Sequence, residues 1–236
     1  MSHTGTENDP DHEVVLAMNG VQHAYHRTVA LRGVSLAVRP AEVVAITGPS
    51  GCGKSTLLHI AAGLIRPPSG SVRLFGCDLA AMSDDERARL RRTRISLVLQ
   101  FGQLVAELPG VDNVALPLLL DGAEPTGARR LAREWLERCG AGDLADTRPD
   151  EMSGGQAQRV AVARSLITSP ALVFADEPTG SLDSIGGQEL LDLLLGEVRV
   201  LGAALIVVTH DNTVAARADR EIRLLDGVIA SESVLA

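Results

Sequence analysis

The sequence contains almost no lysine. Lys54 is the only one, so all the other basic residues among its 22 lysines and arginines are arginines. A compact ammonium and a broad planar guanidinium are not interchangeable where space is tight. A chain that uses arginine everywhere else but lysine here predicts that position 54 requires this particular side chain.

The sequence also lacks an excess of positive charge and has few cysteines. It has 30 acidic residues against 22 basic ones and a net charge of −8, which argues against nucleic acid as its main partner. Its three cysteines, Cys52, Cys77 and Cys139, lie far apart and are odd in number. This spacing predicts neither a zinc site nor a disulfide framework and indicates a reducing compartment such as the cytoplasm.

Long apolar runs are absent as well. The longest ones, residues 114–120 and 203–208, fall far short of about 18 residues, and Pro117 interrupts the first. We therefore expect no segment of the chain to span a membrane. Residues 1–12 are polar and acidic without the basic and apolar regions of a signal peptide, and we expect a flexible tail. The 236 residues, 45% of them hydrophobic, suffice for one α/β domain with a sizeable core.

One stretch fits the phosphate-binding pattern G-x-x-x-x-G-K-[ST]: Gly48-Pro49-Ser50-Gly51-Cys52-Gly53-Lys54-Ser55-Thr56. The apolar run 43–46 before it predicts a buried strand, and residues 57–64 after it predict a helix. In this context backbone N–H groups close around phosphate oxygens at a helix N-terminus. Lys54 would reach the β- and γ-phosphates, and Ser55 would hold Mg²⁺. The alternative is a chance match in a glycine-rich turn. Cys52 either makes the loop sensitive to oxidation or is simply a small tolerated side chain.

Polar residues follow three other apolar runs. Gln100 follows residues 95–99, Asp176 and Glu177 end the run that starts at Leu172, and His210 follows residues 205–208. Ligands of α/β proteins bind at the carboxyl ends of strands. In P-loop ATPases the first of two such acids holds the Mg²⁺ shell and the second polarises the attacking water. Taken singly, Gln100 is also consistent with a surface residue and His210 with a structural one.

Two further features are candidates for nucleotide contacts. Tyr25, the only tyrosine, either stacks on an adenine ring or packs at the edge of one of the strands expected at 14–25 and 31–38. Ser153-Gly154-Gly155-Gln156 precedes a helix expected to reach about residue 168, with Ser153 as N-cap. Two glycines at a helix N-terminus make a second anion site; the alternative is a flexible loop.

The remaining pattern predicts a short strand at 71–75, a hairpin-like return at Gly76-Cys77-Asp78 and a turn between strands at Asp226-Gly227. It also predicts helices at 84–94, 127–139 and 188–200, and helical pieces within 105–120 that loops at Pro109-Gly110 and Pro117 interrupt. The basic face of helix 84–94 is either solvated or a docking surface. We divide the chain into the tail, a catalytic core with a β subdomain (13–83 and 155–236) and a helical subdomain (84–154).

In this order the motifs resemble the nucleotide-binding subunit of ATP-binding cassette (ABC) transporters, over about residues 13–230. Residues 48–56 match the Walker A loop, and residues 172–176 match Walker B with Glu177 as the catalytic acid. The other matches are the Q-loop (Gln100), the signature motif (Ser153-Gly154-Gly155-Gln156), the D-loop (Ser181-Leu182-Asp183), the switch histidine (His210) and the adenine-stacking aromatic (Tyr25).

The resemblance implies an α/β P-loop NTPase core of the RecA-like kind, with an antiparallel β subdomain and an inserted helical subdomain. It implies ATP and Mg²⁺ as cofactors, with Ser55, Gln100 and Asp176 near the metal. It also implies a head-to-tail homodimer, in which each ATP lies between Walker A of one copy and the signature motif of the other. Glu177 would activate water, and His210 would contact the γ-phosphate.

Residues 111–118 and 176–184 resemble the lipoprotein-releasing, cell-division and macrolide-export ATPases in particular. These pair with membrane permeases that have a large extracytoplasmic domain, which implies a peripheral position at the cytoplasmic face of the membrane. The chain departs from the pattern at Met152, where leucine is usual, and at Gln103-Leu104-Val105-Ala106-Glu107. An alternative function is regulation of a membrane partner, such as control of a cell-wall hydrolase. ABC ATPases of translation or DNA repair usually carry a second cassette or long coiled-coil insertions, which this sequence lacks.

Overall fold

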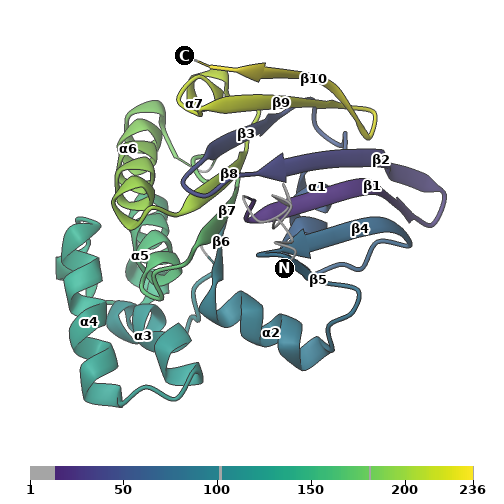
Figure 1. Cartoon of the computed structure of the whole chain (residues 1–236). Helices are drawn as coiled ribbons and strands as arrows, with labels where there is room; N and C mark the ends of the chain where they lie inside the picture. The colour runs from purple at the N-terminus through teal and green to yellow at the C-terminus, as the bar shows by residue number, and fades with distance from the viewer. Residues whose placement is uncertain (1–13, 101–102, 181, 236) are drawn as a thin grey trace, which may run out of the picture.

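The computed structural model describes residues 14–100, 103–180 and 182–235. The tail expected at residues 1–12 and Ser181 of the D-loop lie outside the described residues. The described strands form a four-stranded sheet, in the order β2-β1-β4-β5, and a six-stranded sheet, in the order β10-β9-β3-β8-β7-β6 (Figure 1).

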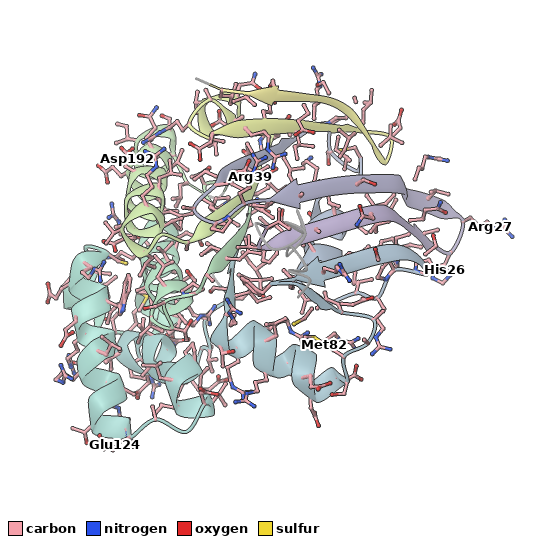
Figure 2. All side chains as sticks on the ribbon, in the orientation of Figure 1. His26, Arg27, Arg39, Met82, Glu124 and Asp192 are labelled. Atoms are coloured by element: carbon pink, nitrogen blue, oxygen red, sulfur yellow. The ribbon has the colours of Figure 1, made fainter. Side chains whose placement is uncertain are left out.

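The four-stranded sheet is antiparallel and follows from two hairpin-like returns. Its strands are β1 (Leu16–Tyr25), β2 (Thr28–Val38), β4 (Ser69–Leu74) and β5 (Cys77–Asp78). β1 pairs with both β2 and β4. His26 and Arg27 lie at the tip of the β1–β2 hairpin (Figure 2), and His26 adopts a positive φ of 50° there. The sheet brings the end of β1, with Tyr25, to the outer rim of the molecule.

The six-stranded sheet is mostly parallel. Its strands are β3 (Val43–Thr47), β6 (Ile95–Leu99), β7 (Leu172–Asp176), β8 (Ala204–Val208), β9 (Arg220–Leu225) and β10 (Val228–Val234). Strands β6, β7, β8, β3 and β9 run parallel, and only the β9–β10 pair is antiparallel. Asp226 (φ 47°) and Gly227 (φ 77°) form the expected tight turn of that hairpin.

Each face of the six-stranded sheet covers a separate hydrophobic core. Side chains alternate along a strand, so Val43 and Ala45 of β3 point to one core and Val44 and Ile46 to the other. The first core includes α5 (Gly154–Leu166) and α6 (Ser184–Leu201); the second includes α1 (Lys54–Ala61) and the antiparallel sheet. Figure 1 shows α5 and α6 on one side of the sheet and β1, β2 and β4 on the other.

Two of the remaining α-helices gather around α5. They are α3 (Gly110–Leu120) and α4 (Pro125–Arg138), whereas α2 (Asp84–Thr93) precedes β6 and the short α7 (Asn212–Ala215) follows β8. Glu124, labelled in Figure 2, caps α4 by accepting hydrogen bonds from the N–H groups of Thr126 and Gly127. Among the described residues, no helix has the combination of length and apolar character needed to cross a membrane.

The expectation that a loop at Pro117 interrupts the helical pieces of 105–120 is wrong, whereas the loop expected at Pro109 is present, because the helix begins only at Gly110. Pro109 is the N-cap of α3, and Pro117 lies inside a helix that continues to Leu120. A proline inside a helix removes one hydrogen bond and costs roughly 3 kcal/mol. Burial of Val111, Val114 and other residues of α3 in the first core offsets this cost.

The range 84–154 is not wholly helical. It contains β6, which forms the edge of the six-stranded sheet and pairs with β7. The division of the chain into subdomains stays an interpretation.

Candidate functional site

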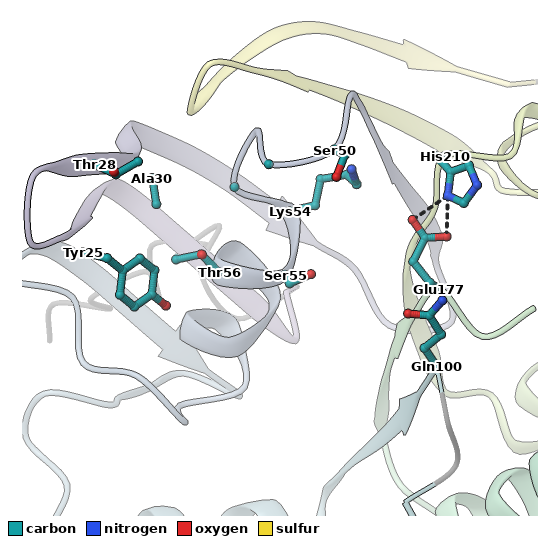
Figure 3. A pocket seen from close by; sticks show the side chains of 12 residues that line it. Tyr25, Thr28, Ala30, Ser50, Lys54, Ser55, Thr56, Gln100, Glu177 and His210 are labelled. Carbon is teal, nitrogen blue, oxygen red and sulfur yellow. Dashed lines mark hydrogen bonds and ion pairs between the residues drawn. The ribbon is translucent and has the colours of Figure 1, made fainter. Parts of the chain in front are cut away.

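A cleft of about 540 Å³ opens beside the loop that follows β3. Figure 3 shows it from close by. Its lining comes from both sheets and from α1: Tyr25, Thr28, Ala30, Ser50, Gly51, Gly53, Lys54, Ser55, Thr56, Gln100, Glu177 and His210.

The order of the parallel strands explains why residues far apart in the sequence meet here. Leu99 of β6 pairs with Asp176 of β7, and Asp176 pairs with Val208 of β8. Val208 also pairs with Ile46 of β3. The four carboxyl ends therefore lie side by side at one edge, and Gln100, Glu177, His210 and the loop all start there.

Two glycines give the loop its shape. Gly48 has a φ of 145° and Gly53 a φ of 107°, a region that other residues rarely adopt. A Cβ on Gly48 would lie 2.1 Å from the carbonyl oxygen of Leu224, and one on Gly53 would lie 2.4 Å from that of Ala30. Only glycine fits at either position. Gly53 is also the N-cap of α1, so the loop leads directly into a helix N-terminus.

Lys54 is 8% exposed, and its ammonium is held by the loop itself. Nζ donates to the carbonyl oxygens of Gly48 at 2.8 Å and Pro49 at 3.0 Å. Within the described part of the chain, no carboxylate pairs with this charge. Carbonyl groups orient an ammonium without neutralising it, and a nearly buried charge is costly unless it is compensated. The charge, together with the N-terminus of α1, makes this end of the cleft suitable for phosphate.

Ser55 and Asp176 meet next to this charge. The Oγ of Ser55 donates to Oδ1 of Asp176 at 3.2 Å. Both groups are hard oxygen donors, and Mg²⁺ is usually held by one or two carboxylates together with phosphates of the substrate and waters. No cluster of three His, Cys, Asp or Glu side chains that could hold a metal occurs among the described residues. The pair therefore fits Mg²⁺ bound jointly with a nucleotide rather than a cage built from protein alone.

Glu177 is held in an unusual backbone conformation. Its φ is 48°, although it is not a glycine. Its N–H donates to Val208 at 2.9 Å, and its carbonyl accepts from Gly180 at 3.0 Å. Strained residues of this kind cluster at functional sites, because the surrounding structure must impose them. Here the strain belongs to the turn that aims the carboxylate into the cleft.

The carboxylate of Glu177 contacts His210. Both carboxylate oxygens lie 2.9 Å from Nδ1 of His210, as the dashed lines in Figure 3 mark. The Glu177 side chain is 18% exposed and that of His210 is 71% exposed. A largely buried carboxylate held by a neighbouring ring can accept a proton from a water molecule, and the exposed ring can reach a ligand in the cleft.

Gln100 and Tyr25 lie at opposite ends of the cleft. A Cβ on Gly180 would come within 2.9 Å of Nε2 of Gln100, so this amide lies against the turn that follows Glu177. Tyr25 is exposed, and its ring meets that of His23 edge to face, with centroids 4.6 Å apart. Tyr25 also borders the open cleft, where a planar ring of a ligand can stack on the tyrosine ring.

The structure decides between the two alternatives for Cys52. Its side chain is buried in the second core, and its Sγ would lie 2.9 Å from a Cβ on Gly48. A buried thiol in apolar surroundings is inert. Cys52 therefore acts as a small packing residue beneath the loop.

The signature residues lie elsewhere. Ser153 caps α5, accepting from the N–H of Gln156 at 3.3 Å, while Oε1 of Gln156 accepts from the N–H of Ser153 at 2.8 Å. Gly154 and Gly155 are the first residues of the helix. Asp183 caps α6 through the N–H of Gly186 at 2.7 Å. None of these residues lines the cleft of their own chain.

Thr28 and Ala30 also line the cleft, although no sequence pattern singles them out. Both are small residues of β2, without a charge or a motif to mark them. The only hint was their position in the β1–β2 hairpin, just across the turn from Tyr25.

The glycine loop, the serine–aspartate pair and the Glu177–His210 pair define a P-loop nucleoside triphosphatase. The comparison with protein families then narrows the class, because the family described as "ABC transporter" matches residues 31–180. The chain belongs to this family. It is an ATP-binding subunit of an ABC transporter with ATPase activity, and the resemblance found in the sequence is confirmed.

Its relatives include proteins named "Lipoprotein-releasing system ATP-binding protein LolD". The one from Shewanella denitrificans is 41% identical over 220 residues, which cover 92% of this chain and 94% of the relative. The one from Hyphomonas neptunium is 42% identical over 217 residues, 90% of this chain and 95% of the relative. These names agree with the lipoprotein-release type that residues 111–118 and 176–184 suggest.

Among solved structures, the dimeric post-hydrolysis state of the ATP-binding cassette MJ0796, bound to ADP and phosphate, has a TM-score of 0.88. It is 35% identical, and the match covers 94% of this chain and 99% of that one. A second dimeric structure of MJ0796, described as a bacterial ABC transporter cassette, has a TM-score of 0.87 at 36% identity. The expected fold, an α/β P-loop core with an antiparallel sheet and inserted helices, is confirmed.

Proposed function

We propose that two copies of this chain close head to tail around ATP and thereby drive a separate membrane permease. One observation carries the proposal. The cleft gathers the phosphate loop, the carboxylate of Glu177 and His210, whereas the glycines at the N-terminus of α5 lie outside it. A single chain thus offers one half of a phosphate site in its cleft and another half elsewhere. A symmetric dimer joins the two halves twice, and the dimeric state of MJ0796 supports this arrangement.

In the proposed site, Lys54 and the N–H groups of residues 48–56 bind the β- and γ-phosphates of ATP. Ser55, Asp176 and Gln100 would hold Mg²⁺, which neutralises phosphate charge when it is bound. Glu177 accepts the proton of the attacking water and His210 contacts the γ-phosphate. Tyr25 stacks on the adenine. Ser153, Gly154, Gly155 and Gln156 of the second copy cover the γ-phosphate, with Asp183 beside them.

The partner in this proposal is an integral membrane permease of the lipoprotein-releasing type, with a large extracytoplasmic domain. The names of the relatives support the type. The chain would then sit at the cytoplasmic face of the membrane, attached through the permease. Closing and opening of the ATP-bound dimer would be the movement that the permease uses.

The variant Glu177→Gln tests the proposal. It keeps the size of the side chain and removes the proton acceptor, so turnover should fall at least about 100-fold. ATP affinity should stay within roughly threefold, because the phosphate-binding groups are untouched. The ATP-bound dimer should accumulate. Phosphate release measures turnover, titration calorimetry measures ATP affinity, and light scattering after size exclusion measures dimer formation. Each is measured with Mg²⁺ and with a chelator.

Glu134→Gln is the matched control. Glu134 forms an exposed ion pair with Arg130 on α4, so its loss should leave turnover unchanged. Ordinary turnover in Glu177→Gln would contradict the role of Glu177. A protein that hydrolyses ATP but stays monomeric in every nucleotide state would contradict the dimer.

A further inference from the structure

Helix α5 is hydrogen-bonded to the end of strand β6. Gln158 is 1% exposed, and its Nε2 donates to the carbonyl oxygen of Leu99 at 3.0 Å. A buried amide is costly unless it is hydrogen-bonded, so this contact is specific rather than incidental. Leu99 is the last residue of β6, and the next residue, Gln100, lines the cleft.

A second contact from the same helix holds the backbone beyond Gln100. Arg164 NH1 donates to the carbonyl oxygen of Gln103 at 3.0 Å. Gln103 has a φ of 46°, a conformation that needs support from its surroundings. Helix α5 therefore binds the backbone on both sides of Gln100, at Leu99 and at Gln103.

The N-terminus of α5 is the signature end. Ser153 caps it, and Gln158 lies five residues further along. A helix rises 1.5 Å per residue, so about 7 Å of rigid helix joins the signature end to the Leu99 contact. Gln100 in turn lies against Gly180, whose N–H donates to the carbonyl of Glu177. A short chain of direct contacts thus runs from the signature end to the turn of Glu177.

We propose that Gln158 and Arg164 are positioning residues, which fix Gln100 relative to the signature end of α5. This inference rests on the proposed dimer. There, the signature end of a chain contacts the ATP of its partner, while Gln100 faces the ATP in the chain's own cleft. Movement of α5 when the partner's ATP binds would shift Gln100 through these two hydrogen bonds. The two ATP sites of the dimer are coupled in this way.

The variant Gln158→Met tests the inference, because it keeps the length of the side chain and removes the donor. We expect kcat to fall about 10- to 100-fold, as for other small misplacements of reacting groups. KM for ATP should stay within about twofold, since the phosphate loop is unchanged, and the Hill coefficient for ATP should approach that of independent sites. Gln158→Asn, whose amide is one methylene shorter, should show a smaller loss of the same kind.

Ser165→Ala is the control on the same helix. Ser165 is buried, and its Oγ donates to the carbonyl of Val162 within α5, so its loss tests helix damage alone. We expect unchanged kcat and Hill coefficient in Ser165→Ala, and similar melting temperatures for all the variants.

The decisive measurement is a double-mutant cycle with Gln100→Ala. If Gln158 acts through Gln100, Gln158→Met should lower kcat less than about twofold when Gln100 is already removed. Equal fold losses in both backgrounds would overturn the inference, with the proposed function intact. If Glu177→Gln fails to dimerise, the proposed function fails and coupling between sites fails with it. The double-mutant cycle keeps Glu177 intact, so it still shows in active protein whether Gln158 positions Gln100.

Discussion

Lys54 brings a positive charge into a nearly buried position. The carbonyl groups of Gly48 and Pro49 hold its ammonium, and a compact ammonium with three rotatable donors can keep both contacts and still face a phosphate. A guanidinium is planar and wider, and its donors point in fixed directions. Arginine therefore does not reproduce the two carbonyl contacts of the ammonium together with a phosphate contact. The single lysine of the sequence thus has a geometric reason.

Lys54→Arg should therefore lose ATP affinity although it keeps the charge. We expect a loss of at least about 10-fold, since a planar fork cannot reproduce the point contact of an ammonium. Lys54→Ala should lose more. Titration calorimetry measures the ATP affinity of both variants. As a control, the opposite exchange at an exposed position of α4, Arg130→Lys, should leave the ATP affinity unchanged. A wild-type ATP affinity in Lys54→Arg would show that a positive charge alone suffices for ATP binding.

The sequence predicted which residues line the cleft better than it predicted what they touch. Gln100, Glu177 and His210 follow apolar runs, and that pattern can be read along the chain. Their contacts depend on tenths of an ångström between distant segments, so neither the Glu177–His210 contact nor the Gln158 bond to Leu99 could be derived. The two alternatives for Cys52 stayed open for the same reason, until its burial was known.

Two helices begin with the same capping box but differ in charge. Ser83 and Glu86 cap α2, and Ser153 and Gln156 cap α5. The first turn of α2 carries three acidic residues, whereas the first turn of α5 carries none and begins with two glycines. Carboxylates at a helix N-terminus already complement its partial positive charge. The N-terminus of α5 keeps its charge available, as an anion site requires.

This contrast yields a matched pair of variants. Ser83→Ala and Ser153→Ala each remove one N-cap, so each should lower the free energy of unfolding by about 1 kcal/mol. Only Ser153→Ala should also lower kcat, by about 10-fold or more, because that hydroxyl would contact the γ-phosphate in the dimer. Urea unfolding and steady-state phosphate release measure the two effects. Equal kcat in both variants would restrict Ser153 to a structural role.

Helix boundaries depend both on local caps and on tertiary packing. The helix after the D-loop begins at Ser184 rather than at 188, because Asp183 supplies the cap. α3 continues past Pro117, because its buried face outweighs the lost hydrogen bond. Caps can be recognised in a sequence, but the tertiary packing that overrides a proline cannot.

At the scale of the whole molecule, the order of the strands creates the cleft. β3 lies between β8 and β9, and β6 lies at the edge beside β7. Periodicity predicts strands but not their neighbours, so residue patterns left this order open, and the family resemblance supplied only the fold class. The same order leaves the N-terminus of α5 outside the cleft. In the proposed dimer, the cleft and this helix N-terminus are the two half-sites that one chain contributes.

A mixture of two impaired variants tests whether these half-sites combine between chains. Lys54→Ala disables the loop half, and Ser153→Ala disables the signature half. In a head-to-tail dimer of one copy of each, both defects fall in the same ATP site, and the other site is built from two intact halves. Equal mixing makes half of the dimers mixed, and each mixed dimer has one intact site. Turnover should therefore rise to at most about a quarter of the wild-type value, with the full quarter reached only if the sites are not coupled. Half-sites that act within one chain give no such recovery, because every chain in the mixture carries a defect. Phosphate release at fixed total protein, before and after mixing, separates the two arrangements.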